Sequence, residues 1–250
     1  MLSGARARSS RRRGSGPVFA LEPHADGLRL HLAGVEVVAT AEGALWVETQ
    51  RALIVSDLHL EKGSSLARGG RMLPPYDTRS TLTALEAVIA RRNPQVVVAL
   101  GDSFHDPGGP SRMAQDDLER LRMLMRGLEW IWVEGNHDGA APASLGGRAC
   151  GELSISGLVF RHEPQPAPQE GEVAGHLHPC ARVLGTSGAV RRRCFATDGR
   201  RLVLPAMGAF AGGLNVRDIA FAPLFPEGCC ALALSRGRVL PAGWGRLAPD

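Results

Sequence analysis

The sequence has few of the residues that mark secreted, redox-active or membrane-spanning proteins. It contains five cysteines, an odd number, with no C-x-x-C pair and no apolar secretory segment. This cysteine usage indicates a reducing compartment and argues against a zinc or redox site built from thiolates. No apolar run approaches the ~20 residues that a membrane-spanning helix needs. We therefore expect a cytoplasmic protein with no membrane partner.

Lysine is almost absent, and the positive charge is unevenly placed. Lys62 is the only lysine among 29 basic residues, and the formal net charge is +4. Residues 1–17 carry five arginines and no acid, so the remainder of the chain has a net charge of −1, four minus five. A globally basic surface is therefore not predicted, and a nucleic-acid partner must be inferred from the site itself.

The composition predicts one folded domain behind a short tail. Residues 1–17 are rich in Arg, Ser and Gly and cannot form a core, so they are predicted to be a disordered tail. Residues 18–250 suit a single domain, because one core extends to about 250 residues. Short apolar runs predict buried strands at 52–56, 96–100, 130–133, 158–161, 172–174, 201–204 and 230–234. Helices are expected after caps at Asp77 or Thr78 and at Ser111. The order of these elements indicates an α/β sandwich of two sheets.

Polar side chains follow the predicted strands where turn residues begin. The segments are "LIVSDLHLEKGSS", "VVVALGDSFHD", "IWVEGNHD", "LVFRH" and "EVAGHLHP". Ligands bind outside the carboxyl ends of strands in open α/β sheets, so these side chains are expected to converge at one edge. In chain order they are Asp57, His59, Asp102, Asn136, His137, Asp138, His162, His176 and His178.

The residue types at these strand ends point to a two-metal centre. Carboxylate, imidazole and amide oxygen donors suit manganese, iron or zinc. One carboxylate can bridge two ions about 3.5–4 Å apart, and two such ions activate water and neutralise charge on a phosphoester. Each motif alone has a simpler explanation as a turn or a helix cap. Their joint occurrence, all at strand ends, favours a phosphoesterase.

The order D-x-H, G-D, G-N-H-[DE], H, G-H-x-H from residue 57 to 178 resembles the calcineurin-like metallophosphoesterase superfamily. The resemblance implies a sandwich of two mixed β-sheets flanked by helices, holding two divalent ions. Manganese is expected, with iron or zinc as alternatives. The implied ligands of one ion are Asp57, His59, Asp102 and His178. Those of the second are the bridging Asp102 with Asn136, His162 and His176.

The same resemblance implies roles for residues that do not bind metal. His137 would contact the phosphate and protonate the leaving oxygen, with Asp138 orienting it. The Arg of the phosphoprotein phosphatase form G-D-x-x-D-R-G is missing here. The observed G-D-x-F-H is similar to the DNA nucleases of the superfamily, in which this histidine, His105 here, helps to hold the phosphodiester. A loop histidine without that role is the alternative.

Longer segments resemble a bacterial group, the ligase-associated DNA damage response endonucleases. They are "SDLHLEKGSSLARGGRMLPPYDTRSTL", "LGDSFHD" and "LPAMGAFAGGLNV", and the similarity covers about residues 28–235. It implies an endonuclease for single-stranded or flexible DNA with a functional link to a DNA ligase and a helicase. Lys62, Arg71 and Arg79 are then candidate contacts to the DNA backbone, with a solvated face as the alternative.

Two other functions stay open from the sequence. A hydrolase of a small phosphoester, such as a cyclic nucleotide or dinucleotide, would use the same centre, although no cap domain is evident and an open rim suits a polymer. A non-enzymatic scaffold is the second alternative, and the complete ligand set argues against it. Gly208, Gly212 and Gly213 predict a turn, with backbone N–H groups near the phosphate as the alternative.

Overall fold

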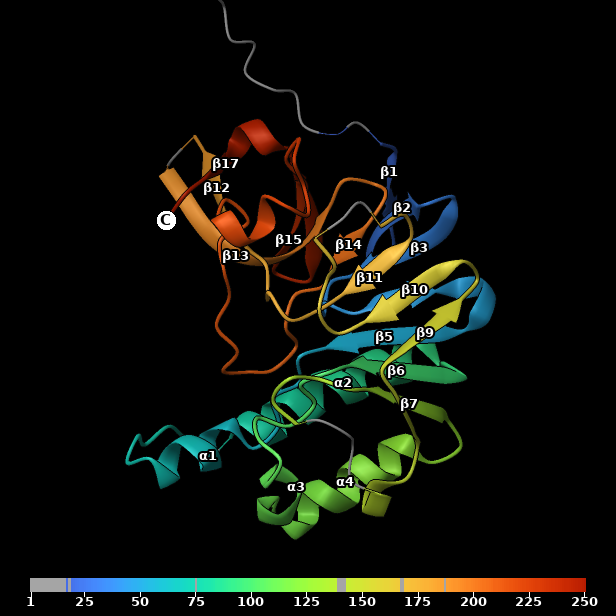
Figure 1. Cartoon of the computed structure of the whole chain (residues 1–250), viewed down its shortest axis with the longest axis vertical. Helices are drawn as coiled ribbons and strands as arrows, with labels where there is room; N and C mark the ends of the chain where they lie inside the picture. Colours follow the sequence, from blue (N-terminus) through green and yellow to red (C-terminus); the bar gives the residue numbers. More distant parts are fainter. Residues whose placement is uncertain (1–16, 18, 75, 139–142, 167–168, 187) are drawn as a thin grey trace, which may run out of the picture.

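Two mixed β-sheets face each other, and the longer helices cover the outer face of one of them (Figure 1). This confirms the predicted α/β sandwich. The computed structural model describes residues 17, 19–74, 76–138, 143–166, 169–186 and 188–250. The predicted tail therefore lies outside the described residues except for Pro17. In the described part of the chain, no helix is long and apolar enough to cross a membrane.

The first sheet is antiparallel at one side and parallel at the other. Its strands pair in chain order, and the pairs from β5 to β8 are parallel. Parallel neighbours need long crossover connections, which α2 and α4 provide here. The strands are β1 (Leu21–His24), β2 (Gly27–Leu32), β3 (Val35–Thr40), β4 (Leu45–Val47), β5 (Ala52–Ser56), β6 (Val96–Leu100), β7 (Glu129–Val133) and β8 (Arg148–Cys150).

The second sheet has the order β16-β15-β13-β14-β11-β10-β9, and β12 and β17 pair off that path. Strand β11 pairs in parallel with both β10 and β14. The strands are β9 (Glu152–Ile155), β10 (Leu158–Arg161), β11 (Glu172–Ala174), β12 (Cys180–Gly185), β13 (Gly188–Thr197), β14 (Leu202–Val203), β15 (Cys230–Ser235), β16 (Arg238–Ala242) and β17 (Leu247–Ala248).

Four α-helices lie between strands of the first sheet: α1 (Lys62–Arg68), α2 (Asp77–Arg92), α3 (Gly109–Arg112) and α4 (Gln115–Met125). Helix α2 buries Leu82, Leu85 and Val88 at helical spacing against the outer face of that sheet. Short 3₁₀ segments occur as η1 (Glu48–Gln50), η2 (Ala143–Leu145), η3 (Ile219–Phe221) and η4 (Trp244–Arg246).

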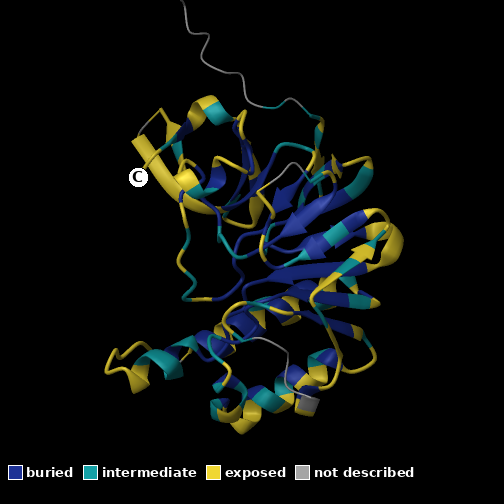
Figure 2. Cartoon of the chain, in the orientation of Figure 1, coloured by how far each residue is buried: buried dark blue, intermediate teal, exposed yellow. Residues whose placement is uncertain are grey.

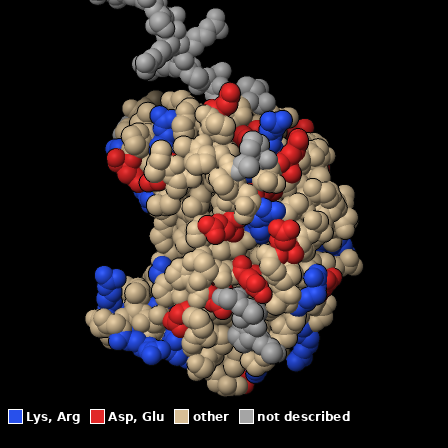
Figure 3. Space-filling model, in the orientation of Figure 1, with Lys and Arg blue, Asp and Glu red and all other residues tan. Residues whose placement is uncertain are grey.

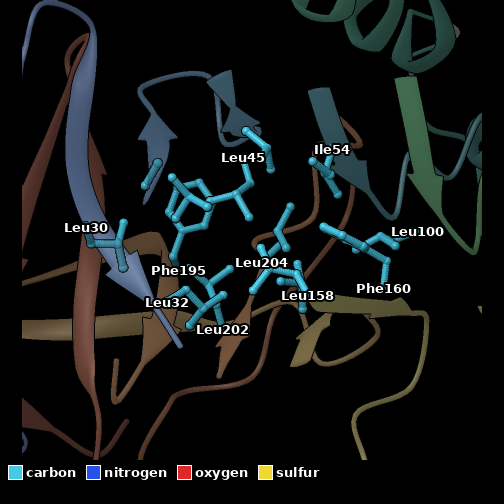
Figure 4. Packing of buried hydrophobic residues seen from close by; sticks show 14 of the residues in the cluster. Leu30, Leu32, Leu45, Ile54, Leu100, Leu158, Phe160, Phe195, Leu202 and Leu204 are labelled. Atoms are coloured by element: carbon cyan, nitrogen blue, oxygen red, sulfur yellow. The ribbon is translucent and has the colours of Figure 1, made fainter. Parts of the chain in front are cut away.

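The space between the sheets is filled by apolar side chains from both inner faces (Figure 4). Alternate residues of each strand supply them, because successive side chains point to opposite faces. Buried strands therefore lie at the centre of the molecule, and exposed residues lie on its rim and helices (Figure 2). Leu30, Leu32, Leu45, Ile54 and Leu100 of the first sheet meet Leu158, Phe160, Phe195, Leu202 and Leu204. This packing fixes the ends of β5–β7 relative to those of β10 and β11.

Four of the predicted strands agree with the structure at both ends. The bounds expected at 52–56, 96–100, 158–161 and 172–174 match those of β5, β6, β10 and β11. The predicted helix caps are wrong. Helix α2 begins at Asp77, and neither Asp77 nor Thr78 caps it, because Asp77 accepts from Gly63 N in α1 and Thr78 donates to Glu61 just before α1. Ser111 lies inside α3, and the next helix begins at Gln115.

Candidate metal centre

The candidate site residues lie at the carboxyl ends of parallel strands from both sheets. Asp57 and His59 follow β5, and Asp102 follows β6. His162 follows β10 in the second sheet, which faces the first across the core. The structure thus brings the seven predicted metal ligands to one edge of the sandwich, with Asn136 following β7 and His176 and His178 following β11.

Five of these residues turn the chain through the left-handed backbone region. Their φ angles are 52° at Asp57, 42° at His59, 44° at Asp102, 67° at His176 and 47° at His178. This region is uncommon for residues other than glycine, and it costs of order 1–3 kcal/mol each. Backbone hydrogen bonds hold the turns in place, including His59 N to Asp102 O at 2.9 Å.

The glycines of the motifs allow the loops to approach one another closely. A Cβ atom at Gly101 would lie 2.4 Å from the ring of His162, and one at Gly135 would lie 2.1 Å from the backbone nitrogen of Asp102. A Cβ at Gly175 would lie 1.9 Å from the hydroxyl of Ser56. These distances are below van der Waals contact, so a side chain at any of the three positions would displace the loops.

Asp57, His59 and His178 form the first cluster of candidate ligands, with donor atoms within 4.8 Å of one another. The Nε2 atoms of the two histidines lie 3.1 Å apart, and His178 Nε2 lies 3.1 Å from Asp57 Oδ1. The other carboxylate oxygen of Asp57 accepts hydrogen bonds from the Ser56 hydroxyl and from the backbone nitrogen of His176. Ser56 therefore fixes the carboxylate, a role that the sequence did not reveal.

Asp102, His162 and His176 form the second cluster. His162 Nε2 lies 3.4 Å from Asp102 Oδ2 and 3.2 Å from His176 Nδ1. Oδ1 of Asn136 lies 2.9 Å from each of these histidine nitrogens. The amide therefore stands where a fourth ligand of this cluster would be needed.

Asp102 reaches both clusters. Its Oδ2 atom lies 3.4 Å from His162 Nε2 in one cluster and 4.0 Å from His59 Nε2 in the other. Its Oδ1 atom accepts a hydrogen bond of 2.9 Å from the backbone nitrogen of His137. This position between the clusters is the one that a bridging carboxylate must occupy.

The site residues fit two divalent ions. Paired imidazole nitrogens face each other, and carboxylate and amide oxygens complete two adjacent donor sets that suit manganese, iron or zinc. Burial lowers the pKa of His59 to about 3 despite the nearby carboxylates, so its ring is neutral and ready to bind metal. Burial opposes protonation of His162 too, but its hydrogen bond to Asp102 and the charges of Asp57 and Asp102 raise its pKa to about 9.

His137 lies at the opening of the centre, with 42% of its side chain exposed. Its Nδ1 atom lies 3.1 Å from the carbonyl oxygen of His105, which can only accept, so Nδ1 carries a proton. The two rings stack with centroids 5.3 Å apart. The carboxylate of Asp138 accepts a hydrogen bond of 2.9 Å from the backbone nitrogen of Phe104. Asp138 is thus hydrogen-bonded to the backbone of the loop that carries His105.

The three candidate DNA contacts lie at different distances from the centre. Lys62 lies beside it, two residues after Leu60, whose carbonyl oxygen accepts from His105 N at 3.0 Å. Burial lowers the pKa of both His59 and His105, and the charge of Lys62 lowers each further. Burial also lowers the pKa of Lys62 itself. Arg71 is exposed after the end of α1, whereas Arg79 is directed to α4, where its Nε atom lies 3.5 Å from Asp117.

The segment that follows β14 is hydrogen-bonded to the backbone of the first cluster. The backbone nitrogen of Gly208 donates to Asp57 O at 3.0 Å, so it is engaged by the protein. Arg193 donates to the carbonyl oxygens of Ala206 and Met207 at 2.8 and 3.5 Å. The run of three arginines in β13 contained no signal that its last member would play this structural part.

Known proteins share this fold. The calcineurin-like phosphoesterase profile matches residues 50–202. The chain belongs to the calcineurin-like phosphoesterase family. It is therefore a metal-dependent phosphoesterase, and its fold and two ligand clusters imply divalent metal ions. Among curated protein sequences, none matches the chain.

Solved structures give a finer comparison for this calcineurin-like phosphoesterase. The Pseudomonas putida nuclease MPE is 27% identical, with a TM-score of 0.66, over 86% of this chain and 98% of that one. YfcE, a phosphoesterase from E. coli, is 17% identical with a TM-score of 0.39, over 78% of this chain and 98% of that one. The first similarity supports a nuclease-type member of the family, and the second is too weak to support an argument.

Replacement of the bridging carboxylate should empty both metal sites. We expect Asp102→Ala to lose both ions, because Asp102 stands between the clusters. His178→Ala touches only the first cluster and should keep one ion. Elemental analysis after dialysis against manganese measures both variants. Two ions retained in Asp102→Ala would contradict the bridging assignment.

Metal binding should release a proton from His162. Its pKa of about 9 means that the ring is charged at neutral pH in the ion-free protein, and a metal ligand must be neutral. Metal affinity should therefore rise with pH up to about 9. Isothermal titration in buffers of different ionisation enthalpy should show about one proton released at pH 7 and less above pH 9.

A matched control removes a histidine that lies outside both clusters. His31→Ala alters an exposed histidine of β2, outside both clusters, and should release the same number of protons as the unaltered protein. Proton release that is absent at pH 7, or that does not fall between pH 8 and pH 10, would refute the assignment to His162.

Proposed function

We propose that this phosphoesterase is a manganese-dependent endonuclease that hydrolyses phosphodiester bonds in single-stranded or flexible DNA. The observation that carries the proposal is the pair of adjacent ligand clusters joined by Asp102 at an exposed rim. The similarity to a nuclease over most of both chains supports the choice of a phosphodiester in nucleic acid.

The chain's own residues suit the chemistry of this hydrolysis. Two bound divalent ions would activate water and neutralise charge on the phosphate. His137 is exposed at the opening, and the carbonyl oxygen of His105 holds its Nδ1 proton. The ring acts as a general acid in its doubly protonated form, in which Nε2 gives its proton to the leaving oxygen and Nδ1 keeps its own. Stacking against His105 fixes the plane of the ring. Lys62 adds a positive charge beside the centre, where the phosphodiester carries a negative one.

A small phosphoester, such as a cyclic nucleotide or a dinucleotide, is the second candidate substrate. The exposed side chain of His137 indicates a rim that a polymer can reach, which favours DNA. A non-enzymatic scaffold does not agree with the family assignment.

A part in DNA repair, with a link to a ligase and a helicase, belongs to the proposal. So does a cytoplasmic location, which the five unpaired cysteines support.

Circular single-stranded DNA separates these functions. We expect the protein to linearise it, because an endonuclease needs no free end, and to do so faster with manganese than with magnesium. Magnesium prefers oxygen ligands and keeps its waters, whereas this centre offers four imidazoles. Gel analysis across a metal panel, beside hydrolysis of 2′,3′-cyclic nucleotides, is the measurement. Turnover of the cyclic nucleotides with the circle left intact would favour the small substrate.

His137 should matter most when the leaving group is poor. A general acid typically contributes 10²–10⁴-fold, and a nucleoside alkoxide needs its proton far more than nitrophenolate does. We expect His137→Ala to lose most of its activity on DNA and clearly less on bis-nitrophenyl phosphate, with both ions retained. Steady-state rates on the two substrates, with elemental analysis, measure this. Equal losses on both substrates would reject the proton-donor role.

A further inference from the structure

Helix α1 and the residues after it project from the body of the molecule beside the metal centre (Figure 1). We call residues 66–74 together with Tyr76 the arm. Most of the arm is exposed, in contrast to the buried strand end from which it arises (Figure 2). The helix begins at Lys62, two residues after Leu60, whose carbonyl oxygen accepts a hydrogen bond of 3.0 Å from His105 N, so the arm starts beside the centre.

Hydrogen bonds hold the base of the arm and define the turn after α1. At its base, Gly63 N donates to Asp77 Oδ2 at 2.8 Å, and Glu61 is hydrogen-bonded to Thr78. At its far end, Arg71 N bonds to Leu66 O and Gly70 N to Ala67 O, which is the Schellman arrangement. Gly70 has a φ of +76°, which this turn requires and which glycine adopts without strain. The base and the turn after α1 therefore have a defined backbone.

Apolar side chains on the arm face solvent. Met72 is 82% exposed, Tyr76 62% and Leu73 37%. Tyr76 is the only tyrosine of the chain. Exposed apolar side chains gathered on one segment, next to a binding site, indicate a surface that contacts a ligand.

The charge of the arm is of one sign. From Lys62 to Tyr76 the chain carries Lys62, Arg68 and Arg71 and no acidic residue. Figure 3 shows blue side chains on the projection that α1 forms. Cations interleaved with an aromatic and apolar side chains match a ligand with a negative backbone and flat apolar faces, which describes an unpaired nucleic-acid strand.

We propose that the arm binds unpaired nucleotides that flank the cleaved phosphodiester, with a base stacked on Tyr76 and phosphates near Arg68 and Arg71. The proposal rests on the proposed function. Base faces are available for stacking only when the strand is unpaired, so the arm selects single strands. Helix α1 spans about 9 Å from Lys62 to Arg68. A nucleotide of a duplex strand rises 3.4 Å and one of an unpaired strand more, so Arg68 lies at most about three nucleotide steps from Lys62.

A second copy of the chain fits the arm less well. A two-fold contact brings the same patch of both copies together, so the two positively charged arms would meet. The arm supplies no acid to neutralise them. Charge complementarity therefore favours the polyanion as the occupant.

The test compares substrates that reach the arm with substrates that do not. We expect Tyr76→Ala to lower kcat/KM on a single-stranded 20-mer roughly 5- to 150-fold, the range that loss of one stacked base gives. Rates on a thymidine dinucleotide and on bis-nitrophenyl phosphate should be unchanged, because neither extends to the arm. Tyr76→Phe keeps the ring and should retain most of the rate on the 20-mer.

Binding is measured separately, by fluorescence anisotropy of the labelled 20-mer with a chelator present to prevent cleavage. Tyr76→Ala should weaken binding of the single strand and leave binding of a 20-bp duplex unchanged. The methionines supply a matched pair. Met72→Ala on the arm should weaken single-strand binding, whereas Met123→Ala on α4, where the side chain is 63% exposed, should not.

Several results would overturn the proposal. One is a Tyr76→Ala variant that binds and cleaves the 20-mer like the unaltered protein. Another is an equal loss on the dinucleotide, which would place Tyr76 at the centre. A third is a change of oligomeric state. If the unaltered protein sediments as a dimer, and Tyr76→Ala sediments as a monomer that still binds the single strand, the arm binds a second copy. If the unaltered protein cleaves no DNA, the proposed function fails, and the anisotropy result alone decides on the arm.

Discussion

The centre depends on the left-handed turns that its ligands make where parallel strands end. If the strand simply continued, the side chains of Asp57 and His59 would point the same way but stand roughly 6.5 Å apart along the chain, at about 3.3 Å per residue. The left-handed residues bend the chain so that both side chains enter one cluster. Conformations of this kind persist only where the surroundings over-determine them. Here the hydrogen bond from His59 N to Asp102 O and the close approach at Gly101 and Gly135 provide that restraint.

The ligand motifs could be predicted because their chemistry allows few residue types. A side chain that binds metal must be aspartate, histidine or a similar donor, and parallel strands bring their ends to one edge whatever the details of packing. Strands β5 and β6 were predictable for a related reason, since burial on both faces leaves a continuous apolar run. The alternation of Leu28, Leu30 and Leu32 was a readable signal for β2 that the sequence interpretation missed.

Other features could not be predicted because they depend on contacts between distant segments. The first six residues of β13 are exposed, so they carry no burial pattern. The bonds of Arg193 to Ala206 and Met207 depend on where the segment after β14 passes, and local sequence does not determine this. The direction of Arg79 depends likewise on the position of Asp117 in α4. Asp77 and Thr78 resemble cap residues in sequence, but Gly63 of α1 and Glu61 just before it offer them other partners.

The ligands of each cluster come from both sheets, and this affects how the protein folds. Asp57 and His178 meet in the first cluster although they are distant in sequence, and Asp102 meets His162 and His176 in the second. Each bound ion would therefore act as a cross-link that closes a long loop, and cross-links of long loops restrict the unfolded chain most. Neither sheet alone offers a complete site. The ions should consequently make unfolding of the two sheets more cooperative, and a chelator should lower the melting temperature of both together.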